Sequence, residues 1–256
     1  MSDDRFLECH VKDGIATITL NRPPLNVMHL PMMAQFNDVM ESVSADAGLS
    51  AIVIRATGKA FCAGVDVADH TPEKVGEMIS QFHGIFRKLA ATDAVTLAVV
   101  QGAALGGGCE LACFCDIVLA SDRAKFGQPE VQVGVFPPVA ACTFPQRVGL
   151  NRAIELAALG ATIDAAEAYR IGLVNQLYAA AEFETGVRGY LAGLAKLSRP
   201  VMRLAKRATT LWAKDQLLEH LDRAETLYLD ELMQLSDAHE GVTAFMEKRT
   251  PVWTHA

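Results

Sequence analysis

The sequence predicts an α/β protein in which a mostly parallel sheet is followed by a helical C-terminal part. Short apolar runs alternate with runs of helical period over the first 120 residues. Two of the runs, Ala51–Ile54 and Val95–Val100, carry no charge, as is typical of strands buried on both faces of a sheet. From Asn151 onward the periodicity is almost entirely helical. Strands joined through helices run parallel, with right-handed crossovers, so one α/β core is expected.

The elements follow in order along the chain. Phe6–Val11 and Ile15–Leu20 alternate as strands around an Asp13–Gly14 turn, which predicts a hairpin. Apolar residues at helical spacing predict a helix over Pro31–Val43. A second helix is expected over Pro72–Leu89, with Thr71 as its N-cap. A further buried strand is predicted at Ile117–Ala120, after the segment Gly102–Cys115.

The C-terminal part begins with clear helix signals. Asp164 and Glu167 have the spacing of a capping box, and Gly172 supplies a stop. Ser198-Arg-Pro200 opens another helix, after which leucines recur at helical spacing as far as Leu232. We therefore divide the chain into a core over residues 1–197 and a helical region over residues 198–256.

Composition excludes several classes of function. The 256 residues hold 23 Lys and Arg against 30 Asp and Glu, with no basic block, which argues against a nucleic-acid partner. No run of 18 apolar residues occurs, so we expect no membrane span, and the acidic N-terminus does not resemble a signal peptide. The six cysteines lack metal-ligand spacing, which predicts free thiols, no metal site and a cytoplasmic location.

The segment from Gly102 to Glu110 is the most informative one. Three consecutive glycines, Gly106–Gly108, follow a buried strand and precede a helix-like stretch. Amides at such a helix N-terminus could stabilise an oxyanion, or the glycines could simply allow close packing of helix against strand. The residues alone do not separate these two interpretations. A dinucleotide loop is disfavoured, because the run is not G-x-G-x-x-G and Glu110 would repel a pyrophosphate.

A second acid, Glu130, lies 20 residues after Glu110 among apolar residues. An unpaired carboxyl in such surroundings has a raised pKa, which suits a general acid or base. The alternative is a side chain that turns outward or pairs with Lys125 or Arg123. When Glu130 is considered by itself, this alternative is favoured. A third segment, Lys59–Asp66, follows an apolar strand at the carboxyl end, where open sheets bind ligands. It could equally be an ordinary loop.

These three segments, in this order, resemble the crotonase family of enoyl-CoA hydratases and isomerases. The resemblance covers nearly the whole chain and includes Leu20-Asn-Arg-Pro, Ile171–Asn175 and Glu240–Arg249. It implies the crotonase-like ββα spiral core, a C-terminal helical trimerisation region, and assembly as a homotrimer or a hexamer of two trimers. It also implies an acyl-CoA thioester substrate, with CoA as part of the substrate and no separate cofactor.

The resemblance also assigns residues. The backbone N–H groups of Val65 and Gly107 match the oxyanion hole, and Glu110 and Glu130 match the catalytic carboxyls. Family members with both acids commonly hydrate a conjugated double bond, so hydration is expected. Contacts with CoA are implied at five positions, of which the last two reach the CoA of a neighbouring subunit: Leu25, Ala63, Asp66, Phe245 and Lys248.

One stretch departs from ordinary hydratases. Where they carry a glycine-rich sequence, this chain has Gly134-Val-Phe-Pro-Pro-Val-Ala-Ala-Cys142, so we expect a reshaped and stiffer acyl pocket involving Pro138 and Val139. This wall, with Pro23–Met28, is similar to cyclic dienoyl-CoA hydratases that act on cyclohexa-1,5-diene-1-carbonyl-CoA. The competing hypotheses are a straight-chain enoyl-CoA hydratase or double-bond isomerase, and an inactive CoA-binding scaffold.

Overall fold

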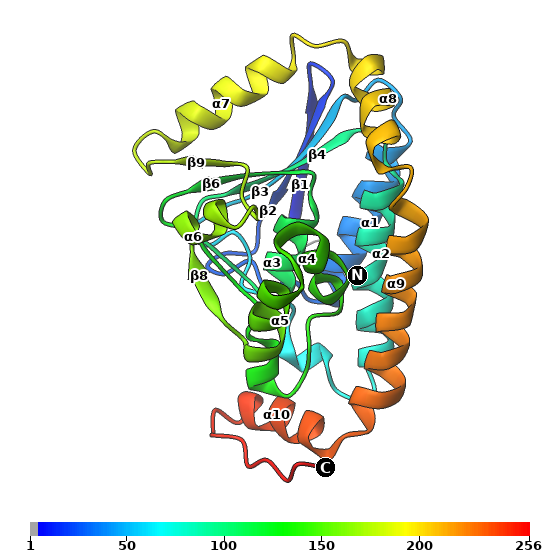
Figure 1. Ribbon diagram of the computed structural model, residues 1–256, viewed down its shortest axis with the longest axis vertical. Coiled ribbons are helices and arrows are strands. Elements are labelled where there is room, and N and C mark those ends of the chain that lie inside the picture. The colour runs from blue at the N-terminus through cyan, green and yellow to red at the C-terminus, as the bar shows by residue number, and fades with distance from the viewer. Residues whose placement is uncertain (1–4) are drawn as a thin grey trace.

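The structure is a computed structural model that describes residues 5–256. Its main sheet has the strand order β1-β2-β3-β4-β6-β9 (Figure 1). The strands are β1 Leu7–Lys12, β2 Ile15–Leu20, β3 Ala51–Ala56, β4 Val95–Val100, β6 Ile117–Ser121 and β9 Gln176–Tyr178. Only the β1–β2 pair is antiparallel, and every other pair in this sheet is parallel. The predicted α/β class, N-terminal hairpin and mostly parallel sheet are confirmed.

A smaller sheet in the order β5-β7-β8 was not predicted. Its strands are β5 Ala103–Leu105, β7 Lys125–Gly127 and β8 Thr162–Asp164, and each has only three residues. Such short strands show no periodicity in the sequence. They form because a partner segment distant along the chain satisfies their backbone hydrogen bonds.

Ten α-helices complete the part of the chain from residue 5 to residue 256, together with four short helical segments. The α-helices are α1 Leu30–Ser44, α2 Val75–Ala91, α3 Gly107–Phe114, α4 Pro138–Val148, α5 Leu150–Leu159, α6 Ala165–Arg170, α7 Phe183–Leu194, α8 Arg199–Thr210, α9 Lys214–Thr226 and α10 Ser236–Met246. The 3₁₀ segments are η1 Val67–Asp69, η2 Pro129–Val133 and η4 Leu232–Gln234. A π-helical segment, η3 Leu227–Glu231, continues α9.

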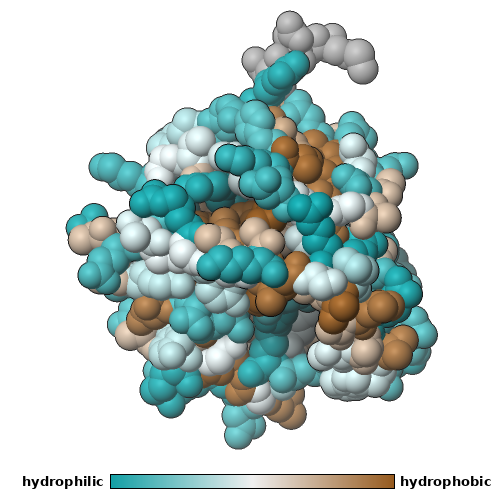
Figure 2. Space-filling view, turned by 90° about the horizontal axis from the view of Figure 1, so that it is seen from above, coloured by the Kyte–Doolittle hydropathy of each residue, from teal (hydrophilic) through white to brown (hydrophobic). Residues whose placement is uncertain are grey.

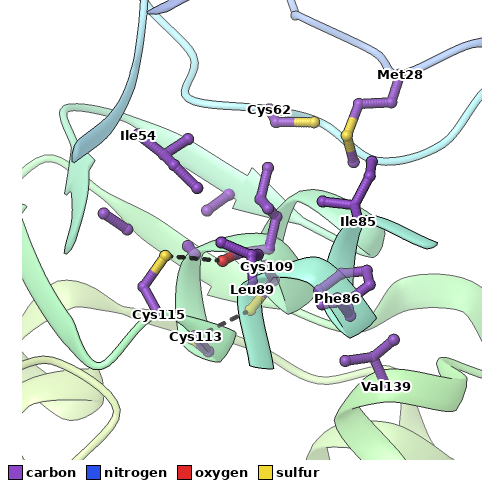
Figure 3. Packing of buried hydrophobic residues seen from close by; sticks show 14 of the residues in the cluster. Met28, Ile54, Cys62, Ile85, Phe86, Leu89, Cys109, Cys113, Cys115 and Val139 are labelled. Carbon is purple, nitrogen blue, oxygen red and sulfur yellow. Dashed lines mark hydrogen bonds between the residues drawn. The ribbon is translucent and has the colours of Figure 1, made fainter. Parts of the chain in front are cut away.

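Helices cover both faces of the main sheet. On β3, Ile52 and Ile54 belong to the large core that α1, α2 and α3 cover, whereas Ala51 and Val53 face α7. Figure 3 shows the packing of the large core, in which Val139 and the cysteines of α3 lie near α2 residues. Burying each large side chain contributes roughly 1.5–3 kcal/mol, so this core holds α3 firmly.

One predicted helix cap is wrong and another is confirmed. Helix α2 begins at Val75 with Lys74 as its N-cap, so the prediction of Thr71 as N-cap was wrong. Thr71 instead accepts, through its carbonyl, backbone bonds from Lys74 and Val75 in a preceding turn. The Asp164 side chain does cap α6, with its Oδ1 2.8 Å from the Glu167 amide nitrogen, and Gly172 has a φ of 90° after that helix.

The C-terminal helices differ in how they pack. Helix α9 runs along α2 and α4, while α10 packs against η1 and η2 at the end of the molecule opposite α7 and α8 (Figure 1). Helix α8 buries none of its residues, although it is strongly amphipathic. Figure 2 shows hydrophobic groups that stay exposed among hydrophilic ones at the end of the molecule that carries α7 and α8. Within residues 5–256, no helix is both long and apolar enough to span a bilayer.

Candidate active site

A cavity of about 340 Å³ opens between α2, α3, η2 and the C-terminal helices. Most of its walls are apolar, and the acids Glu110 and Glu130 both line it. Its other linings are Ala63, Gly64, Val65, Val67, His70, Met78, Ile79, Phe82, Gly106, Gly107, Pro129, Gln132, Val133, Val135, Phe136, Pro138, Tyr228 and Phe245. A largely apolar pocket with a few convergent polar groups is the usual form of a small-molecule site.

The smaller sheet brings the three predicted segments together. A parallel bridge joins Cys62 to Ala104, so the segment before Val65 lies beside β5. On the other side, β5 pairs with β7 so that Leu105 is opposite Gly127. Glu110 follows β5 by five residues and Glu130 follows β7 by three. The two acids, distant in sequence, therefore emerge next to each other.

Two backbone N–H groups face the cavity without a protein partner. Met28 pairs with Gly64 and Asp66 through a parallel bridge, so the N–H of Val65 between them points the other way. Gly107 is the first residue of α3, where a helix leaves its N–H groups unpaired. Among the described residues, neither amide donates a hydrogen bond. Both belong to adjacent segments, because a Cβ on Gly64 would lie 4.0 Å from the Gly107 nitrogen.

The sequence left two interpretations of the three glycines open, close packing of helix against strand and free amides at a helix N-terminus, and the structure shows both. A Cβ on Gly108 would lie 2.2 Å from the carbonyl oxygen of Cys62, so this glycine is needed for close packing. Gly106 has a φ of 53°, and a Cβ there would lie 2.8 Å from Oε1 of Glu130. Gly106 therefore leaves room for the second acid, and Gly107 supplies the unpaired amide.

Glu110 is held by the first turn of α4. Its side chain is almost fully buried at 2% exposure, and Oε1 accepts a hydrogen bond of 2.8 Å from the Ala140 amide. Ala140 is the third residue of α4, whose free amides and dipole favour a carboxylate. Burial nevertheless raises the pKa of Glu110 to about 7, against the lowering effect of the Ala140 and Val139 amides.

Glu130 turns inward. When Glu130 was considered by itself, the sequence favoured a side chain that turns outward or forms an ion pair. Glu130 lies on η2, lines the cavity, and forms no ion pair with Lys125 or Arg123 or with any other described residue. Burial, and then the charge of Glu110, raise the pKa of Glu130 well above its usual value. At neutral pH the pair of acids therefore tends to hold a proton.

Gln128 was not predicted, although it stands two residues before Glu130. It is fully buried, and its side-chain amide lies beside Glu130 and the Gly106 carbonyl. With the amide nitrogen turned toward these acceptors, it lies 3.0 Å and 3.2 Å from the two Glu130 oxygens and 3.2 Å from the Gly106 oxygen. This orientation pairs donors with acceptors, so one amide links the acid to the glycine turn.

The other predicted residues are divided between the cavity and its surroundings. Ala63, Phe245 and Pro138 line the cavity, and Phe245 is 56% exposed. Val139 is fully buried in the core instead of the cavity wall (Figure 3). Three residues lie outside the lining: Leu25, whose carbonyl accepts from the Ala63 amide; Asp66, which caps η1; and the exposed Lys248.

Several lining residues were missed because they come from helices without a recognisable motif. Helix α2 contributes Met78, Ile79 and Phe82, whose helical spacing signals only a buried face. Tyr228 comes from η3, nearly 100 residues after Glu130. His70 follows η1, and its Nδ1 lies 3.0 Å from the Asp66 carbonyl oxygen. No spacing in the sequence connects these residues with the two acids.

Comparison with known proteins agrees with this geometry. Residues 10–256 match the family described as Enoyl-CoA hydratase/isomerase. The chain is 36% identical over 243 residues to cyclohexa-1,5-dienecarbonyl-CoA hydratase of Thauera aromatica, covering 94% of each protein. It is 36% identical over 244 residues to the probable enoyl-CoA hydratase echA8 of Mycobacterium bovis, covering 94% of this chain and 95% of that one.

A solved structure is similar over nearly the whole chain. The crystal structure of an enoyl-CoA hydratase from Mycobacterium avium subsp. paratuberculosis superposes with a TM-score of 0.88 at 32% identity, over 98% of this chain and 99% of that chain. The fold is thus the crotonase fold, as the resemblance implied. The chain is an enzyme of the enoyl-CoA hydratase/isomerase family.

Proposed function

We propose that this enzyme adds water across the conjugated double bond of an enoyl-CoA or dienoyl-CoA thioester. The observation that carries the proposal is that two carboxyl groups with raised pKa values and two unpaired amides line one apolar cavity. In this proposal the thioester oxygen accepts hydrogen bonds from Val65 and Gly107. Charge that develops on this oxygen is stabilised by donors already in position.

The two acids then have complementary roles. Polarisation of the thioester makes the β-carbon electrophilic, and ionised Glu110 takes a proton from water as the water oxygen bonds to that carbon. Protonated Glu130 delivers its proton to the α-carbon, so the product gains H and OH across the former double bond. Glu110 ends protonated and Glu130 ionised, and exchange of a proton restores the starting state. No further cofactor enters these steps, since CoA belongs to the substrate.

The acyl group we propose is a cyclic diene, cyclohexa-1,5-diene-1-carbonyl-CoA. The identity to the Thauera aromatica enzyme supports this choice. The cavity also has flat walls that suit a planar ring, because Phe82, Phe136, Pro138 and Tyr228 line it. A straight-chain enoyl-CoA is the alternative, supported by the equal identity to the mycobacterial protein. Contacts to CoA are proposed from Leu25, Ala63, Asp66, Phe245 and Lys248, with the Lys248 ammonium near a phosphate.

The substrate is tested by following loss of the conjugated-thioester absorbance with the cyclic dienoyl-CoA and with crotonyl-CoA. We expect turnover of both classes to be measurable, with the larger kcat/KM for the cyclic diene. Rapid turnover of crotonyl-CoA and none of the diene would leave a hydratase but remove the cyclic substrate. No absorbance change with either compound, together with double-bond migration in a non-conjugated enoyl-CoA, would identify an isomerase.

We also propose that the enzyme works as a homotrimer or a dimer of trimers in the cytoplasm. The exposed apolar side chains around α8 support an assembly: Leu197, Val201, Leu204, Leu211 and Trp212. Exposed patches of this kind mark interfaces between proteins. The six free cysteines fit a reducing compartment. Light scattering should give three or six times the 27.6 kDa chain mass, and Leu204→Glu should lower it, whereas a monomeric parent would contradict the assembly.

A further inference from the structure

Tyr228 is a polar side chain that lines the cavity beside the two acids, and the mechanism above does not use it. It comes from the π-helical segment η3, which interrupts the regular helix after α9. Such π-helical turns are rare and frequently occur at functional sites, because the extra residue rotates one side chain out of the helical register. The ring is 1% exposed and packs on Phe136, with ring centroids 5.2 Å apart at 59°.

The hydroxyl of Tyr228 is available to a ligand. Within residues 5–256 it makes no hydrogen bond, although a buried Tyr hydroxyl normally finds a partner. Nε2 of His83 has no hydrogen-bond partner and is sealed inside the protein, whereas the Tyr228 hydroxyl has no partner but is not sealed. The hydroxyl therefore opens on the cavity that Tyr228 lines. An unpaired donor in an apolar cavity is costly unless a bound molecule accepts its hydrogen bond.

The surroundings keep this hydroxyl protonated. Burial raises the pKa of Tyr228 above its usual value, and the charges of Glu130 and Glu110 raise it further. The phenol is therefore a neutral donor at neutral pH. In the proposed mechanism Glu110 accepts a proton from water and Glu130 donates its proton to carbon, so neither acid donates a hydrogen bond to the water oxygen. Tyr228 supplies the donor that the pair lacks.

We propose that Tyr228 is a further catalytic residue whose hydroxyl donates a hydrogen bond to the oxygen atom that is added to the acyl group. This inference rests on the proposed hydratase function. In the hydration direction the phenol donates a hydrogen bond to one lone pair of the attacking water oxygen, while the other lone pair of that oxygen bonds to the β-carbon. In the reverse direction it donates to the departing hydroxyl, where negative charge develops, and the proton transfers remain those of Glu110 and Glu130.

The test compares the parent with Tyr228→Phe, which keeps the ring and its packing on Phe136. We expect kcat to fall roughly 10- to 100-fold in both directions, with KM changed less than about threefold, because a donor to developing charge has been removed. Affinity for the 3-hydroxyacyl-CoA product should fall roughly 3- to 10-fold, while affinity for the saturated acyl-CoA stays unchanged. Tyr169→Phe, which removes an exposed hydroxyl on α6, is the matched control.

Two results would overturn the inference. One is a Tyr228→Phe variant with parental kcat and parental affinity for the hydroxylated product. The other is a pH–rate profile displaced to higher pH, which would mean that the hydroxyl acts by donating to Glu130 and positions that acid. An inactive parent would refute the proposed function itself, whereas an active parent with an unaffected variant would refute only the role of Tyr228.

Discussion

The two cavity acids are held by different kinds of structure. Glu110 lies on the regular helix α3, is almost fully buried, and accepts the Ala140 amide from the first turn of α4. Glu130 lies on the short 3₁₀ segment η2, beside a glycine turn and a glutamine amide. The backbone therefore fixes the first acid, whereas side-chain neighbours orient the second.

This difference separates their protonation states. Helix-terminal amides partly offset the burial of Glu110, which leaves its pKa about 7. Burial and the charge of Glu110 raise the pKa of Glu130 well above its usual value, and its own backbone and the Gln128 amide oppose this rise only in part. A pair of carboxyls pushed apart in this way provides one base and one acid at neutral pH. In the mechanism we propose, Glu110 is the base toward water and Glu130 is the donor toward carbon.

The largest expected effect comes from neutralising either acid without changing its shape. We expect Glu110→Gln and Glu130→Gln each to lower kcat about 10²- to 10⁴-fold, because each removes one proton transfer. Binding of a saturated acyl-CoA, measured by calorimetry, should change less than about threefold. Near-parental turnover in one variant would break the comparison by showing that a single acid suffices. Parental turnover in both would favour a role in binding alone.

A smaller effect on stability sharpens the comparison. The pKa of Glu110 is about 7 in the folded protein against 4.5 for a solvated carboxyl. The folded state therefore binds this proton more tightly, and stability is lost as pH rises from about 4.5 through 7. Glu110→Gln removes that loss, so at pH 8 the variant should be more stable than the parent by up to about 3 kcal/mol.

Urea unfolding at pH 5 and pH 8 measures this difference. We expect the difference to shrink to below about 1 kcal/mol at pH 5, because this pH lies only slightly above the pKa of 4.5 of a solvated carboxyl. Glu77→Gln, at an exposed position on α2, is the control and should change stability little at either pH. Equal stability of Glu110→Gln and the parent at both pH values would show that Glu110 remains solvated in the folded protein.

Much of the architecture could be predicted because the long elements carry their own periodic signal. The strand pair at residues 6–20, the buried strands at residues 51 and 95, and α1 all follow from patterns of apolar residues. The start of α2 could not be predicted, because Thr71 has the right type for an N-cap but the chain first makes a turn. The three-residue strands β5, β7 and β8 are too short for any pattern.

The candidate site shows the same division between features that the sequence predicts and features that it does not. The family resemblance, carried by three segments in a fixed order, selected Glu110, Gly107 and Val65, whereas the residue types alone left both interpretations of the glycines open. The sequence alone determined that these groups exist. Tertiary structure decided that Glu130 turns inward, that Gln128 supports it, and that Tyr228 enters the same cavity. The reason is physical: burial, pKa and convergence depend on contacts between segments that the local sequence does not encode.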